Sequence, residues 1–272
     1  MANGRPASVT TKSFFADIRQ SALTSEQWLY ATWFNFLVGY RRTVAGPVWL
    51  LFGPTVFIAT LGLLFAQINA AATELFIPFL GIGLVFWTLF QGFISGGSTI
   101  FVRRRSQIMV ANANLVQVVL LDVFHVLLQF AHQIVIIAVL LILFSIPLTP
   151  ISLISLFGLI LLIANGVWVV TVMGIVGARY RDLNEIANAL LRIAFLATPI
   201  IWMPGGGDRA AVVTGFMLFN PFYHFLEIVR APLLGQVPAL ISWIVVGTIT
   251  LVGFAMAQFV YNRYAKQVPL WL

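Results

Sequence analysis

The sequence contains no cysteine and few charged residues. Of its 272 residues, 8% are Asp, Glu, Lys or Arg. The lack of cysteine excludes disulfide bonds and thiolate metal ligands as supports of the fold. Hydrophobic residues make up 61% of the chain and the mean hydropathy is +1.00. This composition excludes an ordinary soluble domain and predicts a membrane protein, for which length does not indicate the number of domains.

Lysine is also scarce, since the chain contains only Lys12 and Lys266. A phosphate-binding P-loop needs a Gly-Lys-Ser/Thr sequence at the start of a helix, and neither lysine follows a glycine. The acidic residues Asp122, Asp182 and Glu185 are scattered, whereas a membrane-embedded transferase would need them clustered for metal or general-base chemistry. The sequence therefore predicts no enzyme, no metal site and no cofactor site in this chain. Active transport would need ATP hydrolysis by another chain.

Long stretches without Lys, Arg, Asp or Glu run through most of the chain. About 20 apolar residues cross the hydrocarbon core of a bilayer, so each stretch can span it and the longest, 123–178, can span it twice. The expected fold class is an all-α integral membrane protein, with a cytoplasmic N-terminal segment at 1–43 and one six-span domain at 44–272. The six predicted transmembrane helices are 44–66, 76–100, 119–144, 151–177, 186–203 and 239–261.

Positive charges stand on alternate sides of the predicted spans. Arg103, Arg104 and Arg105 follow the second span, and Arg179 and Arg181 follow the fourth. Further cations precede the first span and follow the last. Because positive charges mark the cytoplasmic side, both termini are expected in the cytoplasm. The net charge of +7 then sets topology beside anionic lipids and does not indicate nucleic-acid binding.

An aromatic segment precedes the first span. Thr24 and Gln27 have the spacing of a helix capping box, and the apolar run after them is too short to cross. We predict an amphipathic helix in the membrane interface, where Trp and Tyr rings suit the headgroup region. The helix is either an anchor or a gate at a substrate entrance. The residues assigned to that entrance are Trp28, Trp33, Tyr40, Arg41, Arg42, Arg179, Arg181 and Arg192.

Arg192 is the only cation well inside a predicted span. Its side chain either snorkels to the cytoplasmic surface or draws in an anionic headgroup. His125 and His132 are seven residues apart and therefore share one face of the third span. A metal ion would need further ligands, and none is evident nearby in the sequence. We therefore predict that both histidines are structural.

Aromatic residues recur along the second span at helical spacing, which places them on one face. They serve either as packing and lipid-facing surface or as the lining of a substrate channel, on which sugar rings slide by stacking. Gly92 and Gly96 form a GxxxG pair that permits close helix approach. The channel hypothesis names Phe79, Phe86, Trp87, Phe90 and Phe93.

The region from 198 to 238 is the least regular part of the sequence. Proline and glycine residues end a helix near Pro199, and two short apolar helices joined by Asn220-Pro221 follow. Neither piece can cross a bilayer, so we predict a re-entrant helical hairpin on the outer side at 204–235, between spans five and six. Glu227 and Arg230 are expected to form an ion pair. The residues assigned to this hairpin are Asn220, Pro221, His224, Glu227 and Arg230.

Four stretches of the sequence carry a family resemblance. They are 40–49 (YRRTVAGPVW), 79–87 (FLGIGLVFW), 179–183 (RYRDL) and 220–224 (NPFYH), the last followed by Arg230. In this order, and over nearly the whole chain, they resemble the permease subunit of ABC exporters for polysaccharides. That group includes exporters of O-antigen, capsule and teichoic acid.

The resemblance implies a homodimer in a bacterial inner membrane that binds two copies of a nucleotide-binding ATPase, which holds ATP and magnesium. It also implies export of a lipid-linked polysaccharide, and we expect an undecaprenyl-linked O-antigen type. Teichoic acid, capsule, a glycolipid or a drug are alternative cargoes, and a membrane transferase or a channel is the remaining alternative. Segment 103–117 is then the coupling helix or else a loop that only sets topology. The coupling residues are Arg103, Arg104, Arg105, Ile108 and Leu115.

Overall fold

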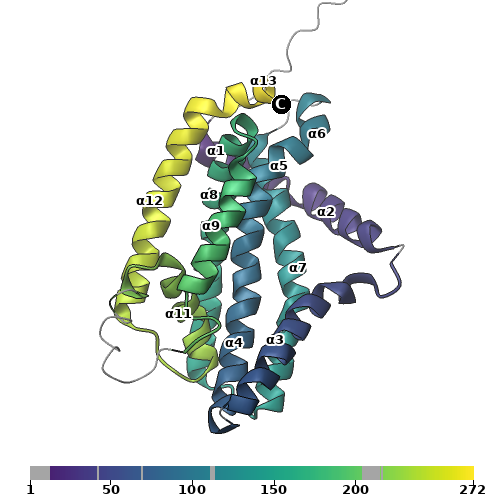
Figure 1. Cartoon of the computed structure of the whole chain (residues 1–272). Coiled ribbons are helices and arrows are strands. Elements are labelled where there is room, and N and C mark those ends of the chain that lie inside the picture. Colours follow the sequence, from purple (N-terminus) through teal and green to yellow (C-terminus); the bar gives the residue numbers. More distant parts are fainter. Residues whose placement is uncertain (1–12, 42, 69, 111–113, 204–214, 216) are drawn as a thin grey trace, which may run out of the picture.

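The computed structural model describes residues 13–41, 43–68, 70–110, 114–203, 215 and 217–272, and every regular element in them is a helix (Figure 1). Five helical segments in these residues are long and apolar enough to cross a membrane. They match five of the six predicted spans to within a few residues at most ends, so the all-α class is confirmed. The five segments are Gly46–Phe65, Glu74–Arg103, Leu115–Leu143, Pro150–Arg179 and Leu240–Trp271.

The remaining predicted span, 186–203, corresponds to α9 (Leu183–Ala197), which has 15 residues. At about 1.5 Å per residue this helix is about 22 Å long, whereas the hydrocarbon core is about 30 Å thick. Thr198 leaves helical geometry with ψ of 138°. The six-span count therefore stays a prediction. Residues 204–214 and 216 of the expected hairpin lie outside the described residues, and the helix after Asn220 is α11 (Pro221–Leu233).

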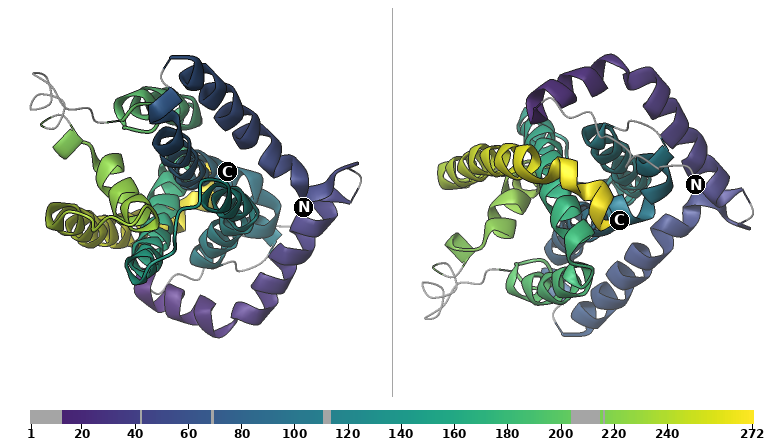
Figure 2. Two further views of the ribbon diagram at one scale, coloured as in Figure 1. Left: turned by 90° about the horizontal axis from the view of Figure 1, so that it is seen from below. Right: turned by 90° about the horizontal axis from the view of Figure 1, so that it is seen from above.

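Helix α4 (Ala70–Gln91) is the centre of the fold (Figures 1 and 2). It continues through a five-residue π-helix, Gly92–Gly96, into α5 (Gly97–Arg103). Helices α3 (Trp49–Ile68), α7 (Leu115–Leu143) and α11 all contact α4. In the apolar window of the α4 span 67% of the residues are buried, against 11% in the α3 span. Protein therefore covers α4, and α3 is left to face its surroundings.

Small residues set the closest helix contacts. Helix α8 (Ile154–Arg179) lies against α5 and α12 (Leu240–Tyr264). A Cβ atom on Gly177 of α8 would stand 1.9 Å from the Ser98 carbonyl oxygen of α5. A Cβ atom on Gly92 would stand 2.6 Å from the Val126 side chain of α7, so the close approach predicted for Gly92 is confirmed.

The N-terminal helix α1 (Phe14–Leu23) is tied to the far end of the chain. Ser13 caps it by accepting a hydrogen bond from the Ala16 amide. The Tyr261 hydroxyl of α12 donates to Oδ2 of Asp17 at 2.8 Å, and the ring centroids of Phe14 and Tyr261 are 5.5 Å apart. The start of the described chain is therefore anchored on α12.

Helix α2 (Ser25–Tyr40) runs outward from the bundle, as Figure 1 shows. The predicted capping box at its start is wrong, because the Thr24 side chain makes no capping hydrogen bond to α2. Its hydroxyl donates instead to the carbonyl groups of Gln20 and Ser21 at the end of α1. Thr24 is the single residue between the two helices, and it serves the helix that ends there.

The segments predicted to be cytoplasmic come together at one end of the bundle, the upper end in Figure 1. Helix α13 (Val268–Trp271) contacts both α6 (Arg105–Val110) and α8. Arg179 at the end of α8 stacks over the Trp271 ring, with 5.2 Å between its guanidinium carbon and the ring centroid. Cations from three distant parts of the sequence thus share one end, as the alternating charge pattern predicts.

Candidate functional site

The aromatic residues assigned to a channel lie in the interior of the chain. The Phe86 ring contacts Phe130 of α7, with centroids 5.3 Å apart. The Trp87 ring contacts Phe195 of α9 at 5.4 Å and Phe222 of α11 at 5.1 Å. Other side chains of the same chain therefore cover these rings, and the contacts favour the packing alternative. The exposed fractions of Phe79, Phe86, Trp87, Phe90 and Phe93 are 9, 4, 2, 7 and 3%.

Phe90 and Phe93 also line an apolar cavity of about 400 Å³ between α4, α8, α11 and α12. Trp168 borders it, and its indole N–H donates to the side-chain oxygen of Asn165 at 2.7 Å. Asn165 in turn donates to the Thr250 hydroxyl of α12 at 2.7 Å. The polar groups beside the cavity are thus paired with one another, and the cavity presents hydrocarbon. The channel role of the stripe stays a prediction for the assembled transporter.

Arg230 of α11 is the most deeply buried cation among the described residues, with 2% of its surface exposed. Its Nη1 donates to the Pro199 carbonyl at 2.7 Å, and its guanidinium carbon lies 3.6 Å from the centroid of the Phe79 ring. In the described structure Arg230 makes no salt bridge with Glu227, so the predicted ion pair is wrong. The guanidinium instead faces the Phe79 ring of α4 and donates to the Pro199 carbonyl after α9.

Asn220 joins α9 to α11. Its side-chain oxygen caps α11 by accepting from the Phe222 amide at 3.0 Å, and Pro221 fits the first helical position. Its side-chain nitrogen donates to the Ala197 carbonyl and the Thr198 hydroxyl at the end of α9. One amide thus fixes the beginning of one helix and the end of another.

His224 is fully buried on α11, and both of its ring nitrogens have partners. Nε2 lies 2.9 Å from the Leu218 carbonyl and Nδ1 lies 2.9 Å from the Ser242 hydroxyl. A carbonyl only accepts, so Nε2 carries a proton and donates to Leu218. Through its contact with Ser242, this histidine therefore holds α11 to α12.

Helix α2 is apolar on two faces, so its predicted amphipathic character is wrong. Trp28 and Phe36 are buried against α7, where the Phe36 ring lies 5.9 Å from His125 and 5.2 Å from His132. Both histidines serve this contact, as their predicted structural role requires. The other face is exposed and apolar, which suits a helix in the membrane interface. Its exposed residues are Tyr30, Trp33, Phe34, Leu37 and Val38.

The cations assigned to a substrate entrance do not form one group. Arg41 is exposed at the end of α2, and Arg42 lies outside the described residues. Arg179 stacks on α13, and Arg181 and Arg192 are exposed near α9 and on it. Beside Arg41, partial burial raises the pKa of the Tyr40 phenol above its usual 10, so its hydroxyl remains a hydrogen-bond donor. The end of α2 thus offers one described cation and one hydroxyl.

The coupling segment is folded differently from its prediction. Ile108 of α6 and Leu115 at the start of α7 are each 0% exposed, because they belong to the core of the chain. They cannot be the apolar contacts offered to an ATPase, and this part of the prediction is wrong. Met109, at 41% exposed, and Arg105 lie on the outward face of α6 instead.

Arg103 does more than set topology, because its Nη2 donates to Oδ1 of Asp122 at 2.9 Å and to the Gly96 carbonyl at 3.0 Å. The Asp122 side chain is 3% exposed, and that of Arg103 is 50% exposed. The Gly96 carbonyl belongs to the π-helix, a form common at functional sites. A lone acid inside a predicted span calls for a named partner, and that signal could have found this pair.

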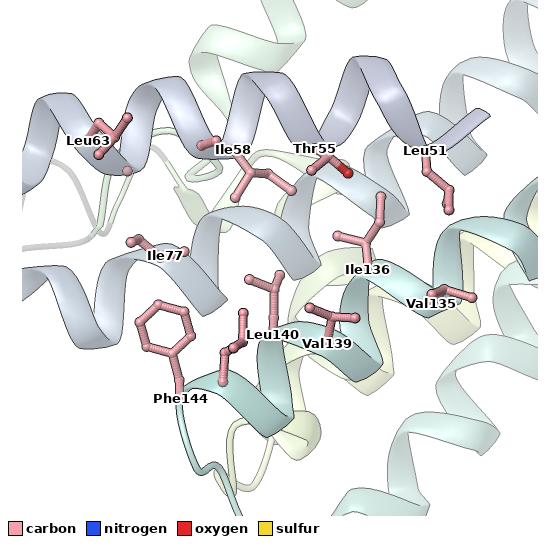
Figure 3. A pocket seen from close by; sticks show the side chains of 13 residues that line it. Leu51, Thr55, Ile58, Leu63, Ile77, Val135, Ile136, Val139, Leu140 and Phe144 are labelled. Carbon is pink, nitrogen blue, oxygen red and sulfur yellow. The ribbon is translucent and has the colours of Figure 1, made fainter. Parts of the chain in front are cut away.

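A second cavity, of about 530 Å³, lies between α3, α4 and α7 (Figure 3). Side chains of α3 point across it toward those of α7. Rim residues such as Leu63, Val139 and Leu143 are 69, 46 and 71% exposed, so the cavity opens outward as a groove. Apart from Thr55, the described side chains that line it are all apolar. We refer to it below as the α3–α7 groove.

Comparison with known families identifies a family to which the chain is similar. The profile described as ABC-2 type transporter matches residues 26–234, which is more than half of the chain. The matched range begins in α2 and ends just after α11. A search of curated proteins gave no match.

Proposed function

Because the chain belongs to the ABC-2 type transporter family, we propose that it is the transmembrane subunit of an ATP-driven exporter of a lipid-linked polysaccharide. The family makes it a transport permease and implies an ATPase partner. The proposed substrate is an undecaprenyl-linked polysaccharide of the O-antigen type, moved from the cytoplasmic to the outer side of a bacterial inner membrane. The four sequence stretches that resemble polysaccharide exporters support this choice.

The observation that carries the proposal is the shared basic end. Cations of α6, α8 and the C-terminal segment meet there, and α13 contacts the other two elements. Exposed apolar side chains lie among them, including Met109 at 41%, Tyr180 at 55% and Leu270 at 71%. We propose that the ATPase, holding ATP and magnesium, docks on this end and that its closure moves the helices as rigid bodies.

The proposed assembly is a homodimer with two ATPase subunits and with both termini in the cytoplasm. In it, α9 and the irregular residues after it form the fifth crossing, followed by the outer hairpin. Irregular backbone at membrane depth needs cover from protein or water. A second copy would supply that cover beside α9, whose outward side chains Ile186, Leu190 and Ile193 are 50, 60 and 65% exposed.

The alternative cargoes share the same architecture. The cavity beside Phe90 and the α3–α7 groove are both apolar, and an amphiphile of any headgroup can place hydrocarbon in them. Teichoic acid, capsule, a glycolipid or a drug would then differ from O-antigen only in what the headgroup path accepts. A membrane transferase or an ATPase-independent channel has no supporting contact among the described residues.

The test is reconstitution of the permease with a candidate ATPase in proteoliposomes. We expect ATP hydrolysis to rise when undecaprenyl-linked O-antigen-type polysaccharide is added, and to stay at its basal rate with the same polysaccharide lacking the lipid. If only lipid-linked teichoic acid stimulates ATP hydrolysis, the substrate is the alternative cargo, teichoic acid. Failure of every candidate ATPase to bind, with a correctly folded permease, would contradict the proposal.

A further inference from the structure

The α3–α7 groove has the volume and the lining of a hydrocarbon site. An apolar cavity of about 150 Å³ takes up a benzene-sized molecule, and this groove measures about 530 Å³. Its residues belong to three of the membrane-spanning segments, so it lies at membrane depth. Water in it would find almost no hydrogen-bond partner, and an empty groove would lose dispersion contacts along its walls. Hydrocarbon is therefore the occupant that the lining favours.

The groove is long and runs along the helices. On α3 it extends from Leu51 to Leu63, a distance of about 18 Å at about 1.5 Å per residue. On α7 it extends from Val135 to Phe144, a distance of about 14 Å by the same rise. Its floor is closed by α4, where Ile77 comes within 3.0 Å of the position of a Cβ atom on Gly62. This shape fits an extended chain and not a compact ring.

Two small residues, Ala59 and Gly62, line the part of the α3 wall toward Leu63. They are three residues apart and therefore lie on one face of α3. A larger side chain at either place would fill the space between the walls.

One end of the groove leads toward a cation. Leu51 lies in the first turn of α3, which follows η1 (Gly46–Val48) and the end of α2. Arg41 is exposed at that end of α2, and Tyr40 keeps its hydroxyl there. An anionic headgroup held at the mouth would meet a positive charge and a hydrogen-bond donor.

We propose that the α3–α7 groove binds the hydrocarbon chain of a polyisoprenyl phosphate, with the phosphate directed toward Arg41 and Tyr40. A polyisoprenyl phosphate combines a long hydrocarbon chain with one anionic group, which match the extended apolar groove and the cation beyond its Leu51 end. The inference rests on the proposed function, and it adds the place where the lipid part of the substrate is held. The polysaccharide itself lies outside this groove.

The test uses the permease–ATPase complex in nanodiscs of phosphatidylethanolamine and phosphatidylglycerol. The probe is undecaprenyl phosphate with a photoreactive diazirine in its chain, and cross-linked peptides are mapped by mass spectrometry. We expect labels within 51–63 and 135–144. Ala59→Trp should lower labelling about tenfold, since the ring displaces about two methylene groups at about 0.8 kcal/mol each. Thr60→Trp, on the next residue but outside the lining, should leave labelling unchanged.

Val139→Trp repeats the test from the α7 wall, so a folding defect of one variant does not decide the outcome. Equal labelling of α3, α8 and α12, or equal labelling by a phosphatidylglycerol that carries the same diazirine, would overturn the inference and assign the groove to bulk lipid. Undiminished labelling in both groove variants would overturn it as well. Lipid-dependent stimulation of the ATPase is measured on the same samples. If stimulation persists while groove labelling is absent, the inference fails and the proposed function stands.

Discussion

Arg103 and Arg230 stand far apart along the central helix of the fold and are stabilised in different ways. Arg230 of α11 lies over Phe79 in the middle of α4, and Arg103 ends α5. The continuous helical path from Phe79 to Arg103 is about 36 Å long at about 1.5 Å per residue. Arg230 is buried without a salt bridge in the described structure, while Arg103 is half exposed and neutralises a buried carboxylate.

The difference shows that the charge of an arginine in this chain does not by itself indicate its structural role. At one end the arginine is the buried partner, and a ring and a carbonyl satisfy it. At the other end the aspartate is the buried partner, and the arginine satisfies it from the surface. The first cluster holds α11 to α4 and to Pro199, and the second holds α5 to α7. The basic end is therefore accessible to a protein partner, and the Arg230 end is a packed joint.

The largest expected effect is the all-or-none labelling that separates the two ends. The natural chain contains no cysteine, so the unmodified protein is the negative control for maleimide labelling. Ser106→Cys and Gln236→Cys each place one thiol at an exposed position. A membrane-impermeant maleimide should label Gln236→Cys in intact cells and Ser106→Cys only after permeabilisation. Labelling of Ser106→Cys from outside would place the basic end on the wrong side for an ATPase.

Arg230→Ala should lower the free energy of unfolding by about 3 kcal/mol, measured in detergent by titration with a denaturant. The change removes a desolvated cation–π contact and leaves the Pro199 carbonyl unpaired beside a new void. The free energy of unfolding of Arg230→Lys should lie between those of the natural chain and Arg230→Ala, because lysine keeps the charge but loses the planar stacking on Phe79. Arg192→Ala, at an exposed position, is the matched control and should change stability by less than about 0.5 kcal/mol. Equal values for both alanine variants would remove the distinction between the two arginines.

Arg103→Ala should lower the free energy of unfolding by about 2 kcal/mol in the same measurement. The change leaves the buried Asp122 carboxylate without its cation. Because Arg103 is half exposed, the loss of stability should be smaller than the full value for breaking a buried pair. Adding Asp122→Asn should recover most of the loss, since a neutral amide tolerates burial without the cation. A double variant as unstable as Arg103→Ala would show that the Gly96 carbonyl, and not Asp122, needs the arginine.

Met109→Glu should change stability least, by less than about 0.5 kcal/mol, because the side chain is on the surface of α6. It should nevertheless release the ATPase during purification if the basic end is the docking surface. Leu148→Glu, at a residue 69% exposed in the loop after α7, is the control for an added acid and should retain the ATPase. Retention of the ATPase by Met109→Glu would remove the functional contrast between the two ends. Release by Leu148→Glu would show that an added acid at either end is enough to release the ATPase.

The sequence predicted best what depends on hydrophobic length and charge order. Five of the six predicted spans, a close helix approach at Gly92 and the gathering of the basic segments all came from patterns along the chain. It predicted less well which face of a helix meets which neighbour. Ile108 and Leu115 were assigned to a partner groove because they are apolar and belong to the segment that begins with three arginines, yet both pack in the core of their own chain. The apolar character of a side chain does not show whether its own chain or a partner protein covers it.

Long-range polar pairs were missed for the same reason. Glu227 lies three residues from Arg230 and suggested an ion pair, but the guanidinium reaches Pro199, 31 residues away. Asp122 and Arg103 are 19 residues apart and meet because the chain folds back between α5 and α7. Spacing in the sequence indicates which residues can contact each other on one helix. A long side chain can also contact residues of any other helix packed around it.

By itself, the sequence predicted that this chain resides in a membrane, the approximate positions of five spans, and that the basic segments share one end of the bundle. Those properties follow from the transfer of apolar residues and cations between water and lipid, and each residue contributes independently of the fold. Only the tertiary structure decided that the aromatic stripe is packed, that Arg230 rests on Phe79, and that α3 and α7 leave a groove between them. Those features depend on how helices fit against one another, and close packing is a property of neighbours in space and not of neighbours in sequence.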